Sequence, residues 1–199
     1  MNPYSIFPDP ELVGNGAVSQ KFRALGVRRF LGACRFVHEL PYGYNSDRDA
    51  PMILFKEMKG SCTTKHATIA ALAEEHSLPI TRGVGIYAMT EALVTGCSRI
   101  LAEYRIPYVP MIHCYLEFEG RKVDLTEGNR NGKNRPIDEF LFTQKVESDI
   151  SAKAEYLVYR KALSDLLQTR AELKGIELRT LLHAREEGLK LLRANIGQE

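Results

Sequence analysis

Cys62 stands where a thiol could act as a nucleophile. Gly60 and Ser61 precede an alanine-rich run that predicts a helix, with Ser61 as its N-cap and Cys62 at its first helical position. A thiol ionises more readily there, because the unpaired amides and the helix dipole stabilise the thiolate. Lys59 and Lys65 could add positive potential. A buried structural cysteine fits the same pattern, so both interpretations stay open at this point.

A predicted β-hairpin supplies a histidine and a carboxylate. Residues 111–118 and 121–126 alternate as two strands joined at Glu119-Gly120, which suits a two-residue turn. Such a turn sets three cross-strand pairs: Phe118 with Arg121, Leu116 with Val123, and Cys114 with Leu125. These residues share one face, which is apolar apart from Arg121 at the turn. His113 and Asp124 therefore fall together on the other face.

The register brings His113 and Asp124 within reach of each other. They are diagonal neighbours, which lie roughly 7–8 Å apart at the backbone. A three-residue turn would put Asp124 on the opposite face from His113, but the sorting of apolar residues argues against it. A nucleophilic thiol needs a base, and the base needs an acceptor that holds its tautomer. The predicted catalytic residues are Cys62 as nucleophile, His113 as base and Asp124 as the orienting group.

Other polar residues near the start of the predicted helix are weaker candidates for a catalytic role. His66 lies one helical turn after Cys62 and could touch it. We expect it to pack or to face the substrate, because a base on the same helix has no evident orienting partner. An oxyanion site needs a donor besides the Cys62 amide. Tyr42, Tyr44 and Asn45 are candidates only because their loop precedes the helix.

Three segments resemble a known superfamily. Residues 59–66, Lys-Gly-Ser-Cys-Thr-Thr-Lys-His, are similar to the nucleophile motif of the transglutaminase-like (papain-related) superfamily. Residues 112–117 and 122–126 resemble its histidine and aspartate strands. The likeness covers roughly residues 20–130. It implies a central helix packed against an antiparallel sheet, with Cys62, His113 and Asp124 as the triad where the two meet.

The chain departs from that superfamily at two places. Many members have a Trp soon after the histidine, whereas Cys114 and Tyr115 follow His113 and the chain contains no Trp. The superfamily's aspartate is usually followed by proline, but Leu125 follows Asp124. Neither change touches the three predicted catalytic residues. The likeness also leaves out the C-terminal helices.

The remaining elements frame this core. We expect a loop-like lead-in over residues 1–18, an exposed loop over 127–138, and a helix over 19–40 that is weakened at Gly26 and Gly32. Further predicted elements are a short helix within 50–59, a strand over 80–89, a helix from Thr90 to about Tyr104, and two amphipathic helices from 151 to 195 divided near Gly175. The fold class is therefore α+β, with residues 1–150 as a transglutaminase-like domain (core about 20–130) and residues 151–199 as a helical hairpin packed on it.

The amino-acid composition is typical of an ordinary globular protein. The chain has 199 residues, of which 44% are hydrophobic and 26% charged, with a formal net charge of +2. No long basic run and no apolar stretch of about 18 residues occur, so we expect no nucleic-acid or membrane partner. Four cysteines without a CxxC pair predict no disulfide framework and no zinc site. We expect a soluble, cytoplasmic protein with Cys34, Cys97 and Cys114 in its core.

Two functions are compatible with these residues. The first is a thiol-dependent amide hydrolase or acyltransferase that acts on a peptide or another amide-containing substrate through an acyl-enzyme. It would need no metal and no organic cofactor. The second is a non-catalytic protein-binding module on the same fold, which the missing Trp and the altered residue after Asp124 favour.

Overall fold

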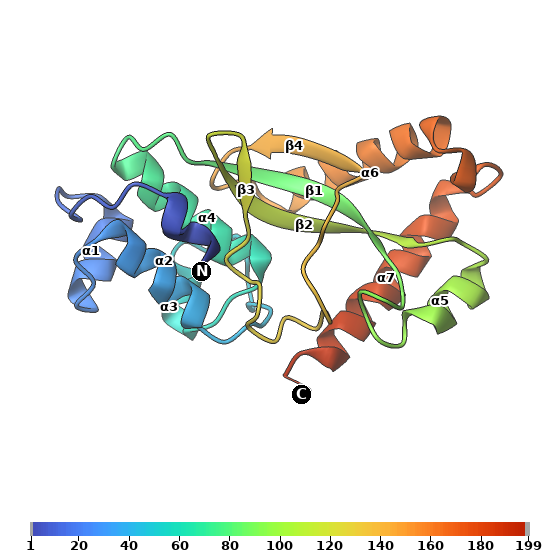
Figure 1. Cartoon of the computed structure of the whole chain (residues 1–199), viewed down its shortest axis with the longest axis horizontal. Coiled ribbons are helices and arrows are strands. Elements are labelled where there is room, and N and C mark those ends of the chain that lie inside the picture. The colour runs from blue at the N-terminus through green and yellow to red at the C-terminus, as the bar shows by residue number, and fades with distance from the viewer. Residues whose placement is uncertain (1, 198–199) are drawn as a thin grey trace. The chain divides into compact units, whose positions relative to one another are not determined.

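The computed structural model describes residues 2–197 and shows a mixed α+β chain (Figure 1). Its four strands form one antiparallel sheet in the order β3-β2-β1-β4. The strands are β1 (Thr81–Met89), β2 (Val109–Phe118), β3 (Arg121–Val123) and β4 (Phe142–Val146). The helices are α1 (Ala17–Ala24), α2 (Phe30–Glu39), α3 (Ile53–Glu57), α4 (Cys62–Glu75), α5 (Cys97–Tyr104), α6 (Ala152–Thr169) and α7 (Leu178–Asn195). The predicted α+β class is confirmed.

The described residues divide into two compact units that interleave along the chain. Unit 1 comprises residues 2–84, 114–129 and 145–150, and unit 2 comprises 85–113, 130–144 and 151–197. Strands β1, β2 and β4 each have residues in both units. Residue 150, where we expected one domain to end, is also the last residue of unit 1. Unit 2, however, holds two earlier segments besides the C-terminal helices.

Helix α4 is the centre of unit 1. Helices α1, α2 and α3 all pack against it. Its alanine-rich sequence has high helix propensity and lets neighbouring backbones come close. Residues on several sides of the helix are therefore buried, among them Ile69, Ala70, Leu72 and Ala73. The same hydrophobic core includes Leu116 and Phe118 of β2 and Val123 of β3. The expected central helix packed on strands is present within this unit.

The N-terminal helical region differs from the prediction in one respect. We expected one weakened helix over residues 19–40, but the chain forms α1 and α2 with a break between them. Gly26 adopts a left-handed conformation with φ 82° just after α1, as is common where a helix ends. Gly32 lies inside α2 without breaking it. The lead-in forms a 3₁₀ turn, η1 (Pro3–Ile6), whose Tyr4 joins the core.

The hairpin has the predicted register. Phe118 pairs with Arg121 and Leu116 with Val123 in the antiparallel ladder. Glu119 and Gly120 have φ values of 49° and 74°, which are typical of a type I′ turn, and a glycine at the second position adopts this φ without strain. The second strand is shorter than expected. It ends at Val123, because the next residue turns the chain.

Unit 2 is built on α5, α6 and α7. Helix α7 packs against α5 and α6, and their apolar faces share a core with Ile86, Met89, Val109 and Met111 of the strands. The two C-terminal helices are confirmed, with a 3₁₀ turn η2 (Ala171–Leu173) and Gly175 between them. The helix expected from Thr90 begins only at Cys97, after Gly96 at φ 90°. Strand β4 was not predicted, because three of its five residues are polar and exposed.

None of the helices within residues 2–197 combines the length and the apolarity that a membrane span requires.

Candidate functional site

Cys62 is the first residue of α4, as the sequence predicts. Ser61 precedes it in an extended conformation, but its hydroxyl makes no capping hydrogen bond. That side chain therefore does not neutralise the positive end of a 14-residue helix. The Cys62 side chain is only 9% exposed, so the thiol lies at the helix N-terminus in a largely buried position.

A closed loop leads into this helix start. The Gly60 amide donates to the Pro41 carbonyl (3.1 Å), and the Gly43 amide donates to the Gly60 carbonyl (3.2 Å). A Cβ atom on Gly60 would lie 2.7 Å from the Thr64 hydroxyl oxygen, closer than side chains tolerate. The glycine before Ser61 is thus required by close approach to the first turn of α4.

Asn45 ties the same loop to α4. The Thr64 hydroxyl donates to the Asn45 side-chain oxygen (2.7 Å), and the Asn45 amide donates to the Lys59 carbonyl (3.1 Å) and to Glu57 (3.0 Å). Both ends of the Asn45 side chain therefore take part in holding the loop. This arrangement argues against Asn45 as an oxyanion donor.

His66 joins the start of α4 to the segment after the hairpin. Its Nε2 accepts a hydrogen bond from the Leu125 amide (2.8 Å), so this nitrogen carries no proton. The proton is then on Nδ1, which donates to the Cys62 carbonyl (2.7 Å). The ring is completely buried. Both ring nitrogens therefore contact backbone groups, which indicates a structural role for His66.

Asp124 shapes its own turn. One carboxylate oxygen, Oδ1, accepts from the amide and from the hydroxyl of Thr126, both at 2.7 Å. This local turn replaces the ladder that would have continued β3. The same oxygen lies 3.4 Å from His66 Nε2. Since that nitrogen accepts the Leu125 amide, the contact is not a charged pair. His66 thus lies between the Cys62 backbone carbonyl and the Asp124 turn.

A second histidine holds the same peptide. His38, near the end of α2, donates from Nδ1 to the Leu125 carbonyl (3.0 Å). Leu125 is completely buried, and His66 and His38 satisfy its amide and its carbonyl. The sequence did not indicate this clamp, because the two histidines are far apart in sequence. The only local signal was the i,i+4 spacing of Cys62 and His66.

Lys65 lies in the interior of unit 1. Its ammonium donates to the carbonyls of His38 (3.2 Å) and Leu40 at the end of α2. Burial lowers the pKa of Lys65 to about 8, and the nearby Asp124 carboxylate opposes that shift. The expected contribution of Lys65 to the potential at Cys62 is thus accompanied by a second role, in which the side chain caps the carbonyl end of α2.

His113 is buried on β2 at 3% exposure and belongs to unit 2. Its ring lies edge-on to Tyr87, with 6.3 Å between the ring centroids. It is the last residue of segment 85–113, and the next residue, Cys114, belongs to unit 1. Cys62 and Asp124 both belong to unit 1. The pairing of His113 with these two residues stays a prediction.

The other three cysteines lie in the core, as expected. Cys34, Cys97 and Cys114 are at most 1% exposed, and none of the four cysteines is in a disulfide. Burial raises the pKa of the Cys34 thiol, and it raises that of Cys97 to about 11. Both are poor nucleophiles at neutral pH for this reason.

Comparison with known proteins gives no relative from which to transfer a function. Neither a scan against protein-family models nor searches of curated proteins and of solved structures found a match. Within residues 2–197, no group of three His, Cys, Asp or Glu side chains is arranged to hold a metal ion. Any functional assignment therefore depends on the chemistry of the chain's own residues.

Proposed function

We propose that the chain is a thiol-dependent amide hydrolase or acyltransferase with Cys62 as its nucleophile. The observation that carries the proposal is the place of Cys62 at the first position of α4, where the Ser61 hydroxyl does not cap the helix. Helix N-terminal amides and the helix dipole favour the thiolate, which is the reactive form. The resemblance of residues 59–66 to the transglutaminase-like nucleophile motif supports the same assignment.

The proposed reaction has two steps. The Cys62 sulfur attacks the amide carbon while His113 takes the thiol proton. The C–N bond then breaks, and His113 returns the proton to the departing amine. Water or a second amine attacks the resulting thioester, gives up its proton to His113 and releases the acyl group from sulfur. Asp124 would orient the imidazole. The choice of acceptor decides between hydrolysis and transfer.

The hydrogen bonds of unit 1 support His113 over its nearest rival. His66 is one helical turn from Cys62, but its ring nitrogens contact the Cys62 carbonyl and the Leu125 amide. His38 is likewise held on the Leu125 carbonyl. The hairpin register from which the pairing of His113 with Asp124 was predicted is present from Leu116–Val123 to Phe118–Arg121, and the pairing itself, beyond that ladder, is part of the proposal.

One observation favours the second candidate, a non-catalytic protein-binding module. A nucleophile must meet its substrate, and the Cys62 side chain is only 9% exposed. The absence of the superfamily's Trp points the same way. In that case Cys62 would pack α4 onto its neighbours and do no chemistry.

Alkylation separates the two candidates. Each variant would be treated with iodoacetamide at pH 6, where an ordinary thiol with a pKa of about 8.5 is almost wholly protonated. Mass spectrometry of peptides would give the labelling rate of each cysteine. We expect Cys62 to react at least tenfold faster than the buried Cys34, and we expect His113→Ala to slow it by a similar factor. His183→Ala, which removes an exposed histidine of α7, is the matched control.

Two results would contradict the enzyme proposal. If Cys62 reacts no faster than Cys34 in the native protein, the thiol is not activated and the binding-module candidate replaces the enzyme. If Cys62 reacts quickly but His113→Ala has no more effect than His183→Ala, His113 is not the base.

A further inference from the structure

A cavity of about 390 Å³ lies in unit 1, and neither Cys62 nor Asp124 is among the residues that line it. It is bordered by one face of α4, by the loop that leads into α3 and by the segment after β4. The α4 residues on its wall include Thr63, Ala67 and Ala71. His66 and Ile69, which share a helical face with Cys62, are not on the wall. The cavity therefore lies against a different face of α4 from the one that carries Cys62 and His66.

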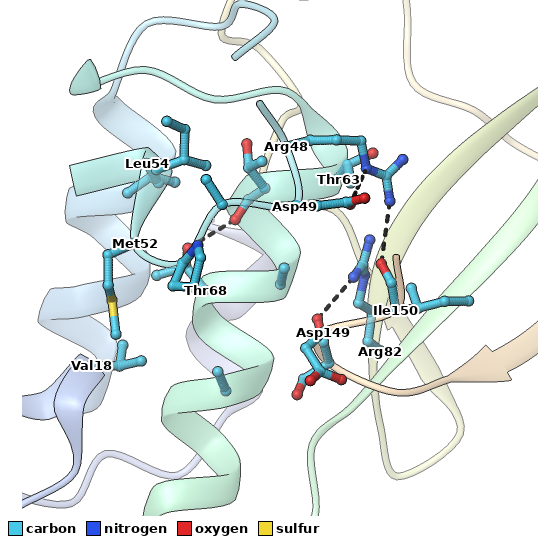
Figure 2. Close-up of a pocket in the computed structure, with 17 residues that line it drawn as sticks. Val18, Arg48, Asp49, Met52, Leu54, Thr63, Thr68, Arg82, Asp149 and Ile150 are labelled. Atoms are coloured by element: carbon cyan, nitrogen blue, oxygen red, sulfur yellow. Dashed lines mark hydrogen bonds and ion pairs between the residues drawn. The ribbon is translucent and has the colours of Figure 1, made fainter. Parts of the chain in front are cut away.

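The two ends of the cavity differ in character (Figure 2). Val18, Met52 and Leu54 lie toward one end, whereas the guanidinium groups of Arg48 and Arg82 lie toward the other. On the α4 wall, Ala67 and Ala71 contribute further apolar groups. Ligand sites are commonly largely apolar, with a few polar groups that fix the orientation of the ligand.

Arg82 is a buried and firmly held residue at the polar end of the cavity. It is 2% exposed, and its guanidinium donates to the Ser148 carbonyl (2.9 Å) and to the Cys114 sulfur (3.3 Å). These contacts hold the group in one orientation. A buried charge is screened less by water than an exposed one, so its positive potential extends into the cavity.

Arg48 adds a second guanidinium at the same end. Its Nη2 lies 3.5 Å from the Ile150 carbonyl and its Nε lies 3.7 Å from Asp49. A carboxylate binds a guanidinium through two parallel hydrogen bonds of about 2.8 Å, so two guanidinium groups at one end of the cavity suit a carboxylate ligand. Asp49 and Asp149 also border the cavity, but both are exposed and better screened.

We propose that this cavity binds a small aliphatic carboxylate, with the carboxylate at Arg48 and Arg82 and the hydrocarbon chain along α4 toward Met52. The volume suits such a ligand. It lies within the range of roughly 300–1,000 Å³ that is usual for small-molecule sites.

The experiment uses octanoate as the probe and isothermal titration of the full chain as the measurement. We expect saturable one-to-one binding. Octan-1-ol, which keeps the chain but lacks the charge, binds at least tenfold more weakly. Acetate, which keeps the charge but lacks the chain, shows no measurable binding at the same concentrations. Equal binding of octanoate and octan-1-ol would overturn the role of the two arginines.

Variants locate the site. Ala67→Leu fills the cavity while keeping high helix propensity, and we expect it to weaken octanoate binding at least tenfold. Ala71→Leu serves the same purpose and covers the case in which the first variant fails to fold, as judged by thermal unfolding. Arg48→Gln should weaken binding about tenfold, whereas Lys56→Gln removes an exposed charge of α3 outside the cavity and should have no effect.

The outcomes are independent of the proposed enzyme activity, because none of these variants alters Cys62, His113 or Asp124. Loss of binding in the cavity-filling and Arg48 variants, with the Lys56 control unchanged, supports the site. Absence of saturable binding to the native chain, or binding that the folded cavity-filling variants leave intact, overturns it.

Discussion

Several buried polar residues of unit 1 hold distant segments together, a role that their positions in the sequence do not indicate. His66, His38 and Lys65 are helix residues, yet all three connect segments distant in sequence. Polar groups in a protein interior stabilise the fold only when their hydrogen bonds are satisfied. The clamp on Leu125 meets that condition, and it fixes the backbone directly after Asp124.

Replacement of His66 by Ala should be strongly destabilising. It leaves the Leu125 amide and the Cys62 carbonyl without the imidazole that now binds both, and it opens a cavity in the core. We expect the free energy of unfolding to fall by about 2–4 kcal/mol. Urea unfolding measures this loss of stability. His183→Ala is the control at an exposed position, and it should change the free energy of unfolding by less than about 0.5 kcal/mol. A loss as small as the control's would contradict the clamp.

The buried ammonium of Lys65 predicts a pH dependence. Its pKa is lowered to about 8 in the folded chain from a usual value of 10.5. Between these values the unfolded chain binds the extra proton, so the folded state gains stability as the pH rises from about 8 toward 10.5. The gain attributable to Lys65 is on the order of 3 kcal/mol at most.

Lys65→Met isolates that contribution, because methionine has a similar length but does not titrate. We expect the stability of the native chain to rise relative to the variant between pH 7 and pH 10, as measured by urea unfolding at each pH. A difference between the two proteins that stays constant over this range would show that Lys65 does not titrate in the folded state near pH 8.

At the scale of elements, α1 depends on a residue of α4. Its N-cap is Gly16, which has no side chain to cap the helix. The Glu75 carboxylate supplies the cap, because it accepts from the amides of Val18 and Ser19 at 2.8 Å each and from the Ser19 hydroxyl. A Cβ atom at Gly16 would collide with that carboxylate, so a side chain there would push Glu75 out of its capping position.

Glu75→Gln tests this cap. One of the two carboxylate oxygens becomes an amide group that cannot accept from a backbone N–H, and the charge at the helix N-terminus is lost. We expect a loss of about 1–2 kcal/mol in the free energy of unfolding. Glu39→Gln is the control, because Glu39 is exposed at the opposite end of a helix, and it should cost no more than a few tenths. Equal effects of the two variants would exclude the cap.

The elements that the sequence predicted correctly are those with strong local signals. Ser61 and the alanine run marked the start of α4, and Glu119-Gly120 together with apolar alternation marked the hairpin register. The elements that were predicted incorrectly are determined by contacts in the tertiary structure. Asp124 ended β3 through a side-chain turn, and β4 is stabilised by pairing with β1 despite its polar residues. The cavity could not be predicted, since its walls come from five separate segments.

At the scale of the whole molecule, the predicted division at residue 150 can be tested by truncation. Within unit 2, Tyr159 of α6 donates to the Pro110 carbonyl of β2 (2.8 Å), and Leu163 and Leu181 share a core with Ile86 and Val109. A chain that ends at Ile150 leaves those strand residues uncovered. We expect it to bind a hydrophobic dye and to lose a cooperative thermal transition.

A chain that ends at Asn195 keeps both helices and should unfold as the full chain does. If the chain ending at Ile150 instead unfolds cooperatively and binds no dye, residues 1–150 are an independent domain, and the C-terminal helices are an addition to it.

The interleaving of the two units also constrains how the chain can fold while it is being synthesised. Segments 85–113 and 130–144 of unit 2 leave the ribosome before α6 and α7 exist to cover them. At roughly 5–20 residues per second, the wait lasts on the order of several seconds. During that time the apolar residues of β1 and β2 in unit 2 remain exposed to other nascent chains and to chaperones. The window for misassembly is therefore set by the speed of translation through residues 151–195.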